Sequence, residues 1–522
     1  MLSESKMDTL IEYISVKTIL LSAMLGLVGY WIMSWAFKKT SKNLPPGPRE
    51  WNTTWKLLKA TWNDSIVELT TEWAMKYGPI TFVSSLGQQI AFLNSPELVR
   101  KLFSSDEYKL LLADRMANAA SRLVWYNRKD LIFTKFDDIM QKKRRMFFKV
   151  IGLYGEGVDK FENVVWGEME RMFAEIEKFQ GKDMNLSLSL SRSLKIIIYI
   201  LAMGERPSDP TIPDILEEYD NAFNKLSAPD VDFVLDKMPI LTKIPGKYKQ
   251  AMNRLSTARK AAEELIYFNP KKTHVPGQPR GIADLLFDLQ KKPGNEWMDT
   301  DPEHIIAFLV SLFFAAHLTT RASLVGSFLC LMNYPNVAKR IQEEVDRVIG
   351  SDRPKLSDRS SMPYTKATTL EVLRYVGQVP LYGFRNASAD ITLDGMTIPK
   401  DTAVVVNSAY FLRDEKLWED PGSFKPERFL DNEGNILPVS HPSRKNLIVF
   451  GAGARSCPGE AFARSRMFLF LTGILQRFDI LPPDNEKLVP ADFKINHEYV
   501  NGFVRQIQPY KCRVIRRQQK TE

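Results

Sequence analysis

The chain has 522 residues, of which 44% are apolar and 25% are charged, and this composition is typical of a globular protein and excludes a disordered or fibrous one. Its three cysteines are too few for a disulfide framework, so we expect the folded part to lie in a reducing compartment. The 71 Lys and Arg residues exceed the 62 Asp and Glu residues by nine, but no basic stripe with interleaved aromatic residues is present, which argues against nucleic-acid binding.

An uncharged run near the N-terminus predicts a membrane anchor. Residues 19–37 (ILLSAMLGLVGYWIMSWAF) carry no charge, and as a helix they would just span the roughly 30 Å hydrocarbon core of a bilayer. Four basic residues follow within a dozen positions, so the positive-inside rule places residues 1–18 in the lumen and the rest in the cytosol. A cleaved signal peptide is the alternative, but the run lacks a small-residue cleavage site and a basic leader.

Residues 38–50 are predicted to form a basic, Pro-rich hinge, and residues 51–522 one mainly α domain with small β-sheets. The run PPGP, which starts at Pro45, cannot continue a helix and is stiff. A segment rich in Pro, Gly and Lys, 269–281, predicts an exposed loop and not a domain boundary, because a helical pattern resumes directly after it. The clearest helical patterns cover 158–179 and 335–349, and the strand patterns cover 80–83 and 402–407.

One predicted helix is much longer than the others. Asp301 can cap it, Pro302 suits its first turn, and its pattern continues without a breaker to Met332, a length of about 45 Å. Its first part is apolar on every face, which is also compatible with a second membrane span. Because His317 and Arg321 interrupt the apolar run, we expect a buried central helix.

The segment 446–460 (NLIVFGAGARSCPGE) combines a strand-like run, a Gly-x-Gly turn, a cysteine and the start of a helical pattern. A dinucleotide-binding fingerprint has a similar order but needs a third glycine where this chain has Ser456. A second interpretation is that Cys457 is an inert buried thiol. Taken alone, the segment leaves both interpretations open beside a third, a haem-binding loop.

In the haem interpretation every special residue of this segment has a function. Cys457 would coordinate the iron as a thiolate, and Arg455 would bind a propionate. The missing side chains of Gly451, Gly453 and Gly459 would let the backbone approach the porphyrin.

Three motifs in one order resemble those of the cytochrome P450 family, the haem-thiolate monooxygenases. The run FGAGARSCPG, which starts at Phe450, reproduces the family's Phe-x-x-Gly-x-Arg-x-Cys-x-Gly loop in full. Upstream, Glu371 and Arg374 fit its Glu-x-x-Arg helix pair, and FKPERF, which contains Arg428, fits its Pro-Glu-Arg-Phe segment. By spacing alone such a pair is usually a surface contact, but the family resemblance implies a charge network of all three residues beneath the haem. The resemblance covers nearly the whole chain and is closest to animal microsomal members.

Further positions follow from the same resemblance. Arg144 matches the family's Trp-x-x-x-Arg helix, whose arginine binds a propionate, although Met140 replaces the tryptophan. Arg385 resembles another propionate-binding position. The basic residues around Arg144 belong either to a solvated helix face or to a docking patch for an acidic reductase. These residues are Lys142, Lys143 and Arg145.

The long helix departs from the family pattern. Its segment AAHLTT, which starts at Ala315, aligns with Ala/Gly-Gly-x-Asp/Glu-Thr-Thr on the haem side, so Ala315 and Ala316 are expected to contact the cofactor. Leu318 replaces the acid, while Thr319 is kept. In the family, the acid and the threonine help to deliver protons during oxygen activation. His317 either substitutes as a proton donor or is a buried histidine with satisfied hydrogen bonds.

The resemblance implies a haem b enzyme that inserts one oxygen atom from O2 into a lipophilic small molecule such as a steroid, fatty acid, terpenoid or xenobiotic. Its electrons would come from NADPH through NADPH-cytochrome P450 reductase, with cytochrome b5 as a further donor, at the endoplasmic reticulum membrane. The missing acid keeps two alternatives open, an isomerase or dehydratase of hydroperoxides that needs neither O2 nor NADPH, and a non-catalytic haem-binding protein. Ordinary core packing is the default for each of the candidate pocket residues, which are Trp125, Phe313, Phe314, Leu318, Leu381, Tyr382 and Val504.

Overall fold

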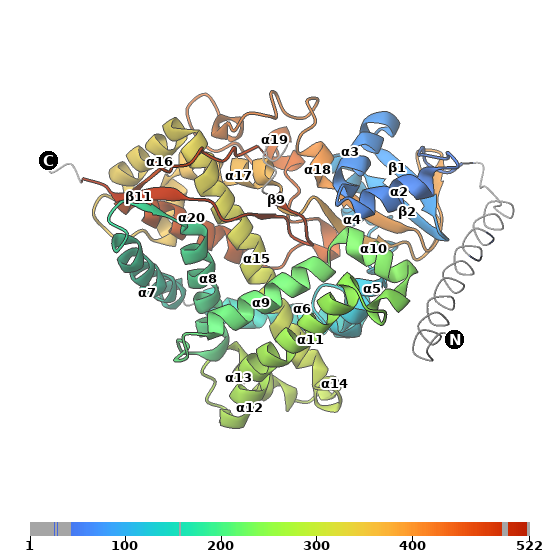
Figure 1. Cartoon of the computed structure of the whole chain (residues 1–522), viewed down its shortest axis with the longest axis horizontal. Helices are drawn as coiled ribbons and strands as arrows, with labels where there is room; N and C mark the ends of the chain where they lie inside the picture. Colours follow the sequence, from blue (N-terminus) through green and yellow to red (C-terminus); the bar gives the residue numbers. More distant parts are fainter. Residues whose placement is uncertain (1–25, 27–28, 30–42, 156–157, 493–498, 519–522) are drawn as a thin grey trace, which may run out of the picture.

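Helices make up most of the protein, and they pack around α15 (Glu303–Asn333), which crosses the middle of the molecule (Figure 1). The structure is a computed structural model that describes residues 26, 29, 43–155, 158–492 and 499–518. The predicted lumenal segment and nearly all of the predicted anchor therefore lie outside the described residues. The predicted mainly α domain with small sheets is confirmed.

The other described helices are, in chain order, α2 (Thr53–Trp62), α3 (Ile66–Tyr77), α4 (Pro96–Ser104), α5 (Ala119–Leu123), α6 (Asp138–Gly155), α7 (Val158–Glu177), α8 (Leu186–Met203), α9 (Ile212–Leu226), α10 (Pro229–Lys237), α11 (Lys247–Glu263), α12 (Asn269–Thr273), α13 (Ile282–Gln290), α14 (Glu296–Thr300), α16 (Pro335–Val348), α17 (Pro363–Val376), α18 (Ser408–Phe411), α19 (Pro442–Asn446) and α20 (Glu460–Arg477). Short 3-10 turns are η1 (Tyr126–Arg128), η2 (Pro239–Thr242), η4 (Leu356–Ser361), η5 (Pro426–Phe429) and η6 (Gly453–Arg455), and η3 (Glu264–Phe268) is a π turn.

Helix α15 is held at its start by a side chain and along its length by close packing. The Glu303 N–H donates to a carboxylate oxygen of Asp301 at 3.1 Å, but the capping residue is Pro302 and not Asp301 as predicted, because the helix starts one residue later than expected. The helix packs against α8, α16, α17 and α20. At Gly326 a Cβ atom would lie 2.6 Å from a methyl group of Val376, so only glycine allows α17 to approach this closely.

Two described helices, α8 and α15, are long and apolar enough to cross a membrane. Their most apolar 18-residue windows are, however, 72% and 83% buried inside the protein. A membrane span would present this surface to lipid, so both are core helices, and the prediction that the long helix is buried and central is confirmed.

The largest sheet joins two distant parts of the chain in the order β1-β2-β7-β4, with β2 and β7 parallel and the other neighbours antiparallel. Its strands are β1 (Ile80–Ser85), β2 (Gln88–Leu93), β7 (Ala403–Asn407) and β4 (Leu381–Asn386). The Phe82 N–H donates to the Pro46 carbonyl at 2.8 Å, which fastens the Pro-rich hinge to β1. The smaller sheets contain β3 (Asp183–Met184), β11 (Cys512–Arg516) and β8 (Phe478–Leu481), then β5 (Ile391–Leu393) with β6 (Met396–Ile398), and β9 (Tyr499–Val500) with β10 (Gln506–Ile507).

Two short segments differ from the sequence-based expectation. In the predicted loop 269–281, the first five residues form α12, because Pro270 in the first turn of a helix needs no N–H partner. The strand-like run before Cys457 pairs with no strand in the part of the chain that the structure describes. Its carbonyl groups have other donors, since the Tyr382 hydroxyl bonds to Ile448 and the Cys457 N–H bonds to Phe450 at 2.8 Å.

Candidate functional site

The cysteine loop lies between α19 and α20 and presents one thiol outwards. The Cys457 N–H bond to the Phe450 carbonyl closes the loop, and the side chain of Cys457 is exposed. The other two cysteines are buried, and burial raises the pKa of the Cys512 thiol to about 12 and that of Cys330 further still. The packed surroundings of Cys457 also raise the pKa of its thiol, so its suitability as a thiolate ligand rests on its exposed side chain and not on a lower pKa.

The three glycines of this loop have different reasons to be glycine. At Gly453, where φ is +69°, a Cβ atom would lie 1.8 Å from the carbonyl oxygen of Phe103 on α4. Gly453 therefore lets the loop dock on α4, which differs from the expected approach to a porphyrin. Gly451 also has a positive φ, +73°. At Gly459 a Cβ atom would meet only the Cys457 sulfur, at 3.9 Å.

Four arginines from distant parts of the chain converge beside this loop, and we call them the arginine cluster. They are Arg115, Arg144 of α6, Arg385 of β4 and Arg455 of η6. Arg115 and Arg385 face each other in an isolated antiparallel β-bridge. Sequence reasoning missed Arg115, and no motif marks it, because only this bridge brings it to the other three.

The hydrogen bonds of the arginine cluster end on backbone carbonyls in the described part of the chain. Arg455 donates to Ala113 at 3.0 Å and to Thr134 at 2.5 Å. The other three arginines also donate to backbone carbonyl oxygens: Arg144 to that of Ser456 at 3.1 Å, Arg115 to that of Ile132 at 3.0 Å and Arg385 to that of Ala452 at 3.4 Å. Arg385 Nε and Arg455 Nη1 are buried without a partner among the described residues. Two N–H donors of the cluster thus lack an acceptor.

The charges of the arginine cluster are only partly compensated, because the Asp114 and Asp130 carboxylates raise the pKa of Arg115 and Arg455 but burial outweighs them. Burial lowers the pKa of Arg115 to about 9 and that of Arg455 to about 10, and it holds the pKa of Arg385 well below its ordinary value. In each case a neighbouring guanidinium group of the cluster lowers the pKa further. Buried cations that repel each other and carry free N–H donors form a site for an anionic group. Two carboxylates, such as the propionates of a haem, fit this site.

Two residues of helix α15, Ala315 and Thr319, are partly exposed, and the three residues between them are buried. Ala315 and Thr319, four positions apart on one face, are partly exposed, whereas Ala316 and Leu318 are buried. The Thr319 hydroxyl donates to the Ala315 carbonyl at 2.8 Å. The structure therefore places Ala315 and Thr319 on one face of the helix and does not place Ala316 or Leu318 there.

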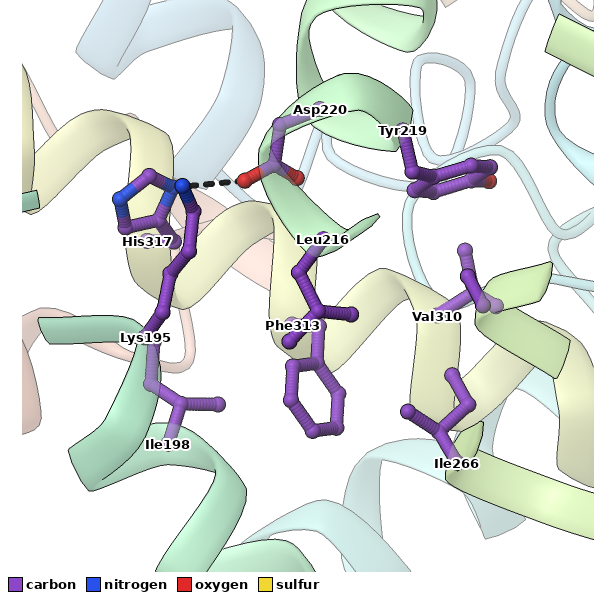
Figure 2. A pocket seen from close by; sticks show the side chains of 10 residues that line it. Lys195, Ile198, Leu216, Tyr219, Asp220, Ile266, Val310, Phe313 and His317 are labelled. Atoms are coloured by element: carbon purple, nitrogen blue, oxygen red, sulfur yellow. Dashed lines mark hydrogen bonds and ion pairs between the residues drawn. The ribbon is translucent and has the colours of Figure 1, made fainter. Parts of the chain in front are cut away.

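His317 points away from this face, towards Asp220 of α9 (Figure 2) and Ser191 of α8. Its Nδ1 lies 2.7 Å from an Asp220 carboxylate oxygen, and its Nε2 lies 3.1 Å from the Ser191 hydroxyl. Burial, together with the positive charges of Lys195 and Arg321, holds the pKa of His317 well below its ordinary value. The candidate role of His317 as a proton donor is therefore corrected, because both ring nitrogens are engaged away from Thr319.

The Glu-x-x-Arg pair is buried and joined by the third predicted residue of its network. Arg374 binds both carboxylate oxygens of Glu371, at 2.6 and 2.7 Å, and neither side chain is exposed. Arg428 Nε lies 3.2 Å from the same carboxylate. Arg374 also donates to the carbonyls of Leu412, Pro421 and Ser423. The network thus ties α17 to η5 and to the chain that leads to it.

The candidate pocket residues do not all lie together. Trp125 and Phe314 belong to an aromatic cluster of five rings in which Trp125 contacts the other four, with ring centroids 4.4 to 5.6 Å apart. The other members, which the sequence analysis missed, are Phe133, Phe223 and Phe503. Aromatic residues give no spacing signal across four separate segments, so no local pattern would have found this cluster.

The remaining candidates lie around the aromatic cluster or away from it. Val504 follows Phe503 and is tied to Asn224 of α9 through its backbone, at 2.8 and 2.9 Å. Leu381 lines a separate apolar cavity of about 60 Å³. One assignment is corrected, because Phe313 faces a cavity of about 10 Å³ beside His317 (Figure 2). The Tyr382 hydroxyl bonds to the cysteine loop, and the place of Tyr382 in the pocket stays a prediction.

The basic residues next to Arg144 do not form one patch. Lys143 is buried, donates to the Thr134 hydroxyl at 3.2 Å, and has its pKa lowered by burial to about 8. Arg145 is exposed, and Lys142 donates to the Gly294 carbonyl at 2.8 Å. The docking interpretation is thus corrected for Lys143, because an internal charge cannot contact a partner protein.

Comparison with known proteins gives one family. A model of the cytochrome P450 family matches residues 45–514. Cytochrome P450 2J3 of Rattus norvegicus is 28% identical over 451 residues, which are 86% of this chain and 88% of that protein. Cytochrome P450 2D26 of Rattus norvegicus is 30% identical over 83% of this chain and 86% of its own length, and cytochrome P450 2D14 of Bos taurus is 29% identical over 84% and 87%.

Replacement of the buried Glu371 is expected to destabilise the protein strongly. Glu371→Gln leaves the positive charges of Arg374 and Arg428 without their carboxylate, and loss of one partner of a buried pair costs about 3–5 kcal/mol of unfolding free energy. Urea unfolding measures this loss. The control is Glu175→Gln, whose partner Lys178 has the same spacing on an exposed surface, and its unfolding is expected to stay close to that of wild type. Equal losses in both variants would contradict the buried network.

Proposed function

The chain belongs to the cytochrome P450 family, and from this premise we propose that Cys457 ligates the haem iron and that the arginine cluster binds the haem propionates. The chain is a cytochrome P450 monooxygenase, an oxidoreductase, and proteins of this family bind haem through a cysteine thiolate. The observation that carries the proposal is the exposed Cys457 loop beside four guanidinium groups, of which the buried Arg385 and Arg455 each keep a free donor.

The chemistry divides between the cofactor and the chain. When bound, thiolate-ligated haem supplies the activation of dioxygen for insertion of one oxygen atom. The Thr319 hydroxyl donates its proton to the Ala315 carbonyl, so its oxygen is left to accept a hydrogen bond. In our proposal this oxygen binds a water molecule and holds that water on the partly exposed face of α15. The buried apolar side chain of Leu318 adds no proton at this position.

The proposed substrate is a lipophilic small molecule such as a steroid, fatty acid, terpenoid or xenobiotic. The aromatic cluster supports this substrate class, because its members adjoin residues of the site along the chain. Phe314 precedes Ala315, and Phe133 precedes Thr134, whose carbonyl binds Arg455. A substrate beside these rings would meet apolar surface.

We further propose that electrons come from NADPH through NADPH-cytochrome P450 reductase, with cytochrome b5 as a second donor. Microsomal relatives of this family imply a reductase of this kind. Arg145, which is exposed on α6 next to Arg144, supports a basic contact for an acidic flavoprotein.

We also propose that the catalytic domain lies against the cytosolic face of the endoplasmic reticulum membrane, held by the anchor 19–37. An exposed apolar surface on and near α2 supports this arrangement. Trp51, Trp55 and Trp62 are 76%, 68% and 73% exposed, and such rings favour the interface between lipid and water. The Lys247 ammonium lies 4.6 Å from the Trp62 ring, which brings the start of α11 beside this surface.

Spin labels report whether α2 touches lipid. In the full chain reconstituted into bilayers, labels at Trp55→Cys and Trp62→Cys are expected to collide more with dissolved oxygen, which concentrates in lipid, than with a water-soluble nickel complex. A label at the exposed Glu175 position is expected to show the reverse order. Collision ratios at positions 55 and 62 that match position 175 would exclude this membrane contact.

Arg385→Gln separates ligand binding from structural support. The substitution removes a buried charge that its neighbours repel, so the unfolding free energy of the haem-free protein is expected to stay unchanged or to rise. The rate of haem transfer to a haem-scavenging protein is expected to increase, because one propionate contact is lost. The control Arg477→Gln alters a surface pair with Glu170, and its haem transfer is expected to match wild type. Faster transfer in both variants would contradict a specific contact by Arg385.

Labelled dioxygen tests the reaction itself. The reconstituted full chain, its reductase, NADPH and a lipid extract are incubated under ¹⁸O2, and one labelled oxygen is expected in the product by mass spectrometry. Cys457→Ser is expected to abolish incorporation. Thr319→Val is expected to lower the rate of labelled-product formation about 10-fold or more, because it removes a hydroxyl that handles protons. Ser327→Ala, two turns further along α15, is the matched control, and its rate should stay unchanged.

Failure to incorporate label has a defined meaning. If control P450 proteins incorporate ¹⁸O and this protein does not, monooxygenation is excluded. Turnover of a lipid hydroperoxide without NADPH would then establish a hydroperoxide isomerase or dehydratase, whose substrate brings its own oxygen. The replacement of the distal acid by Leu318 is the observation that makes this second reaction worth measuring.

A further inference from the structure

Trp125 stands directly before an unusual turn. Tyr126, Asn127 and Arg128, all with side chains, have φ values of +50°, +49° and +67°. Residues other than glycine rarely adopt this left-handed conformation, and three in succession persist only when their surroundings hold them. Strained backbone of this kind gathers at functional sites.

The surroundings of this turn supply the necessary contacts on both sides. The Tyr126 hydroxyl donates to Glu263 of α11 at 2.6 Å, and Arg259 of the same helix donates to the Val124 carbonyl at 2.7 Å. On the other side, Arg128 lies 2.9 Å from Asp114. The chain therefore clamps the turn from two directions and fixes the position of Trp125 between the clamps.

The indole N–H of Trp125 is buried without a hydrogen-bond partner among the described residues. The side chain is 1% exposed, and its ring neighbours are all phenylalanines. An unmet donor in such a place is costly, and the edge-to-face contacts with Phe223 and Phe314 offer at most a weak interaction with an aromatic face. The clamped turn thus holds an unpartnered donor within apolar surroundings.

The aromatic cluster is linked along the chain to the proposed haem site at two members, and a third link comes through Phe384, which stacks on Phe503. Phe133 directly precedes Thr134, whose carbonyl accepts a hydrogen bond from Arg455. Phe314 directly precedes Ala315, which lies on the partly exposed face of α15. Phe384, stacked at 6.3 Å on Phe503, precedes Arg385 of the arginine cluster. These links support a substrate position beside the rings.

We propose that Trp125 is a specificity-determining residue whose indole N–H donates a hydrogen bond to an oxygen acceptor on an otherwise apolar, ring-containing substrate. This inference rests on the proposed function and narrows its substrate class. The phenylalanines take the rings of the substrate, and a carbonyl, ether or hydroxyl oxygen takes the free donor. Substrates that lack such an oxygen leave the donor unmet and bind less tightly.

Two ligands of nearly equal shape test this inference. 9-Fluorenone carries a carbonyl oxygen, and fluorene does not. Their dissociation constants are measured by equilibrium dialysis against the haem-loaded full chain in detergent. Trp125→Phe is expected to weaken the binding of fluorenone about 3- to 10-fold more than that of fluorene, because only fluorenone loses a hydrogen bond. The comparison of two ligands cancels the loss of ring packing that both share.

Trp297→Phe is the matched control. Its indole N–H also lacks a partner among the described residues, but Trp297 is partly exposed on α14, meets the His304 ring edge to face and lies near Lys143. Its substitution is expected to leave the fluorenone-to-fluorene ratio at the wild-type value. If Trp125→Phe does not fold, 3-benzothienylalanine at position 125 keeps the ring shape, replaces the N–H by sulfur and is expected to give the same selective loss.

Three results would overturn the inference. Equal weakening of both ligands by Trp125→Phe means that Trp125 only packs, with its N–H satisfied by ring faces. An unchanged ratio with 3-benzothienylalanine has the same meaning. Failure of the wild-type protein to bind either ligand excludes the substrate class. Failure of the proposed function is distinguishable, because a reduced carbon monoxide spectrum without thiolate ligation would show it while the dialysis measurement remains valid.

Discussion

Repulsion among four guanidinium groups, two of them buried, is the constraint on which the site depends. A folded chain normally pairs such charges, and this chain does so elsewhere, where Arg374 and Arg428 share the carboxylate of Glu371. Beside the Cys457 loop, by contrast, the hydrogen bonds described for the arginine cluster end on carbonyl dipoles, and two donors stay free. The positive charge left there is the reason that we propose a dianionic cofactor at this site.

Helix α15 separates two chemically different environments. One face presents Ala315 and Thr319 to the more open side, where a hydroxyl can hold water. The other face carries His317 into a closed contact with Asp220 and Ser191. Adjacent residues on a helix point about 100° apart, so a residue next to the distal position cannot take over the role of the missing acid. The loss of that acid is therefore not compensated from within the described part of this helix.

Most of the architecture was predictable, because its signals are local. Helical periodicity indicated α7, α15 and α16, and the order of three short motifs indicated the family that the comparison confirms. The errors share one cause. Phe313, His317 and Lys143 are of the right residue type for the roles assigned to them, but each points into a different contact from the one expected. Side-chain direction follows from how helices pack, and spacing along one segment does not encode it.

The sequence by itself determined the cysteine loop, the Glu-x-x-Arg pair and the central helix, since each depends on residues a few positions apart whose geometry the backbone sets. Only the tertiary structure decided which arginines meet and which rings enclose Trp125. Arg115 reaches Arg385 through a bridge between segments 270 residues apart, and the aromatic cluster draws its rings from separate parts of the chain. Such contacts arise because folding buries apolar surface wherever it fits, and the charged and polar groups carried with that surface are brought together as a consequence.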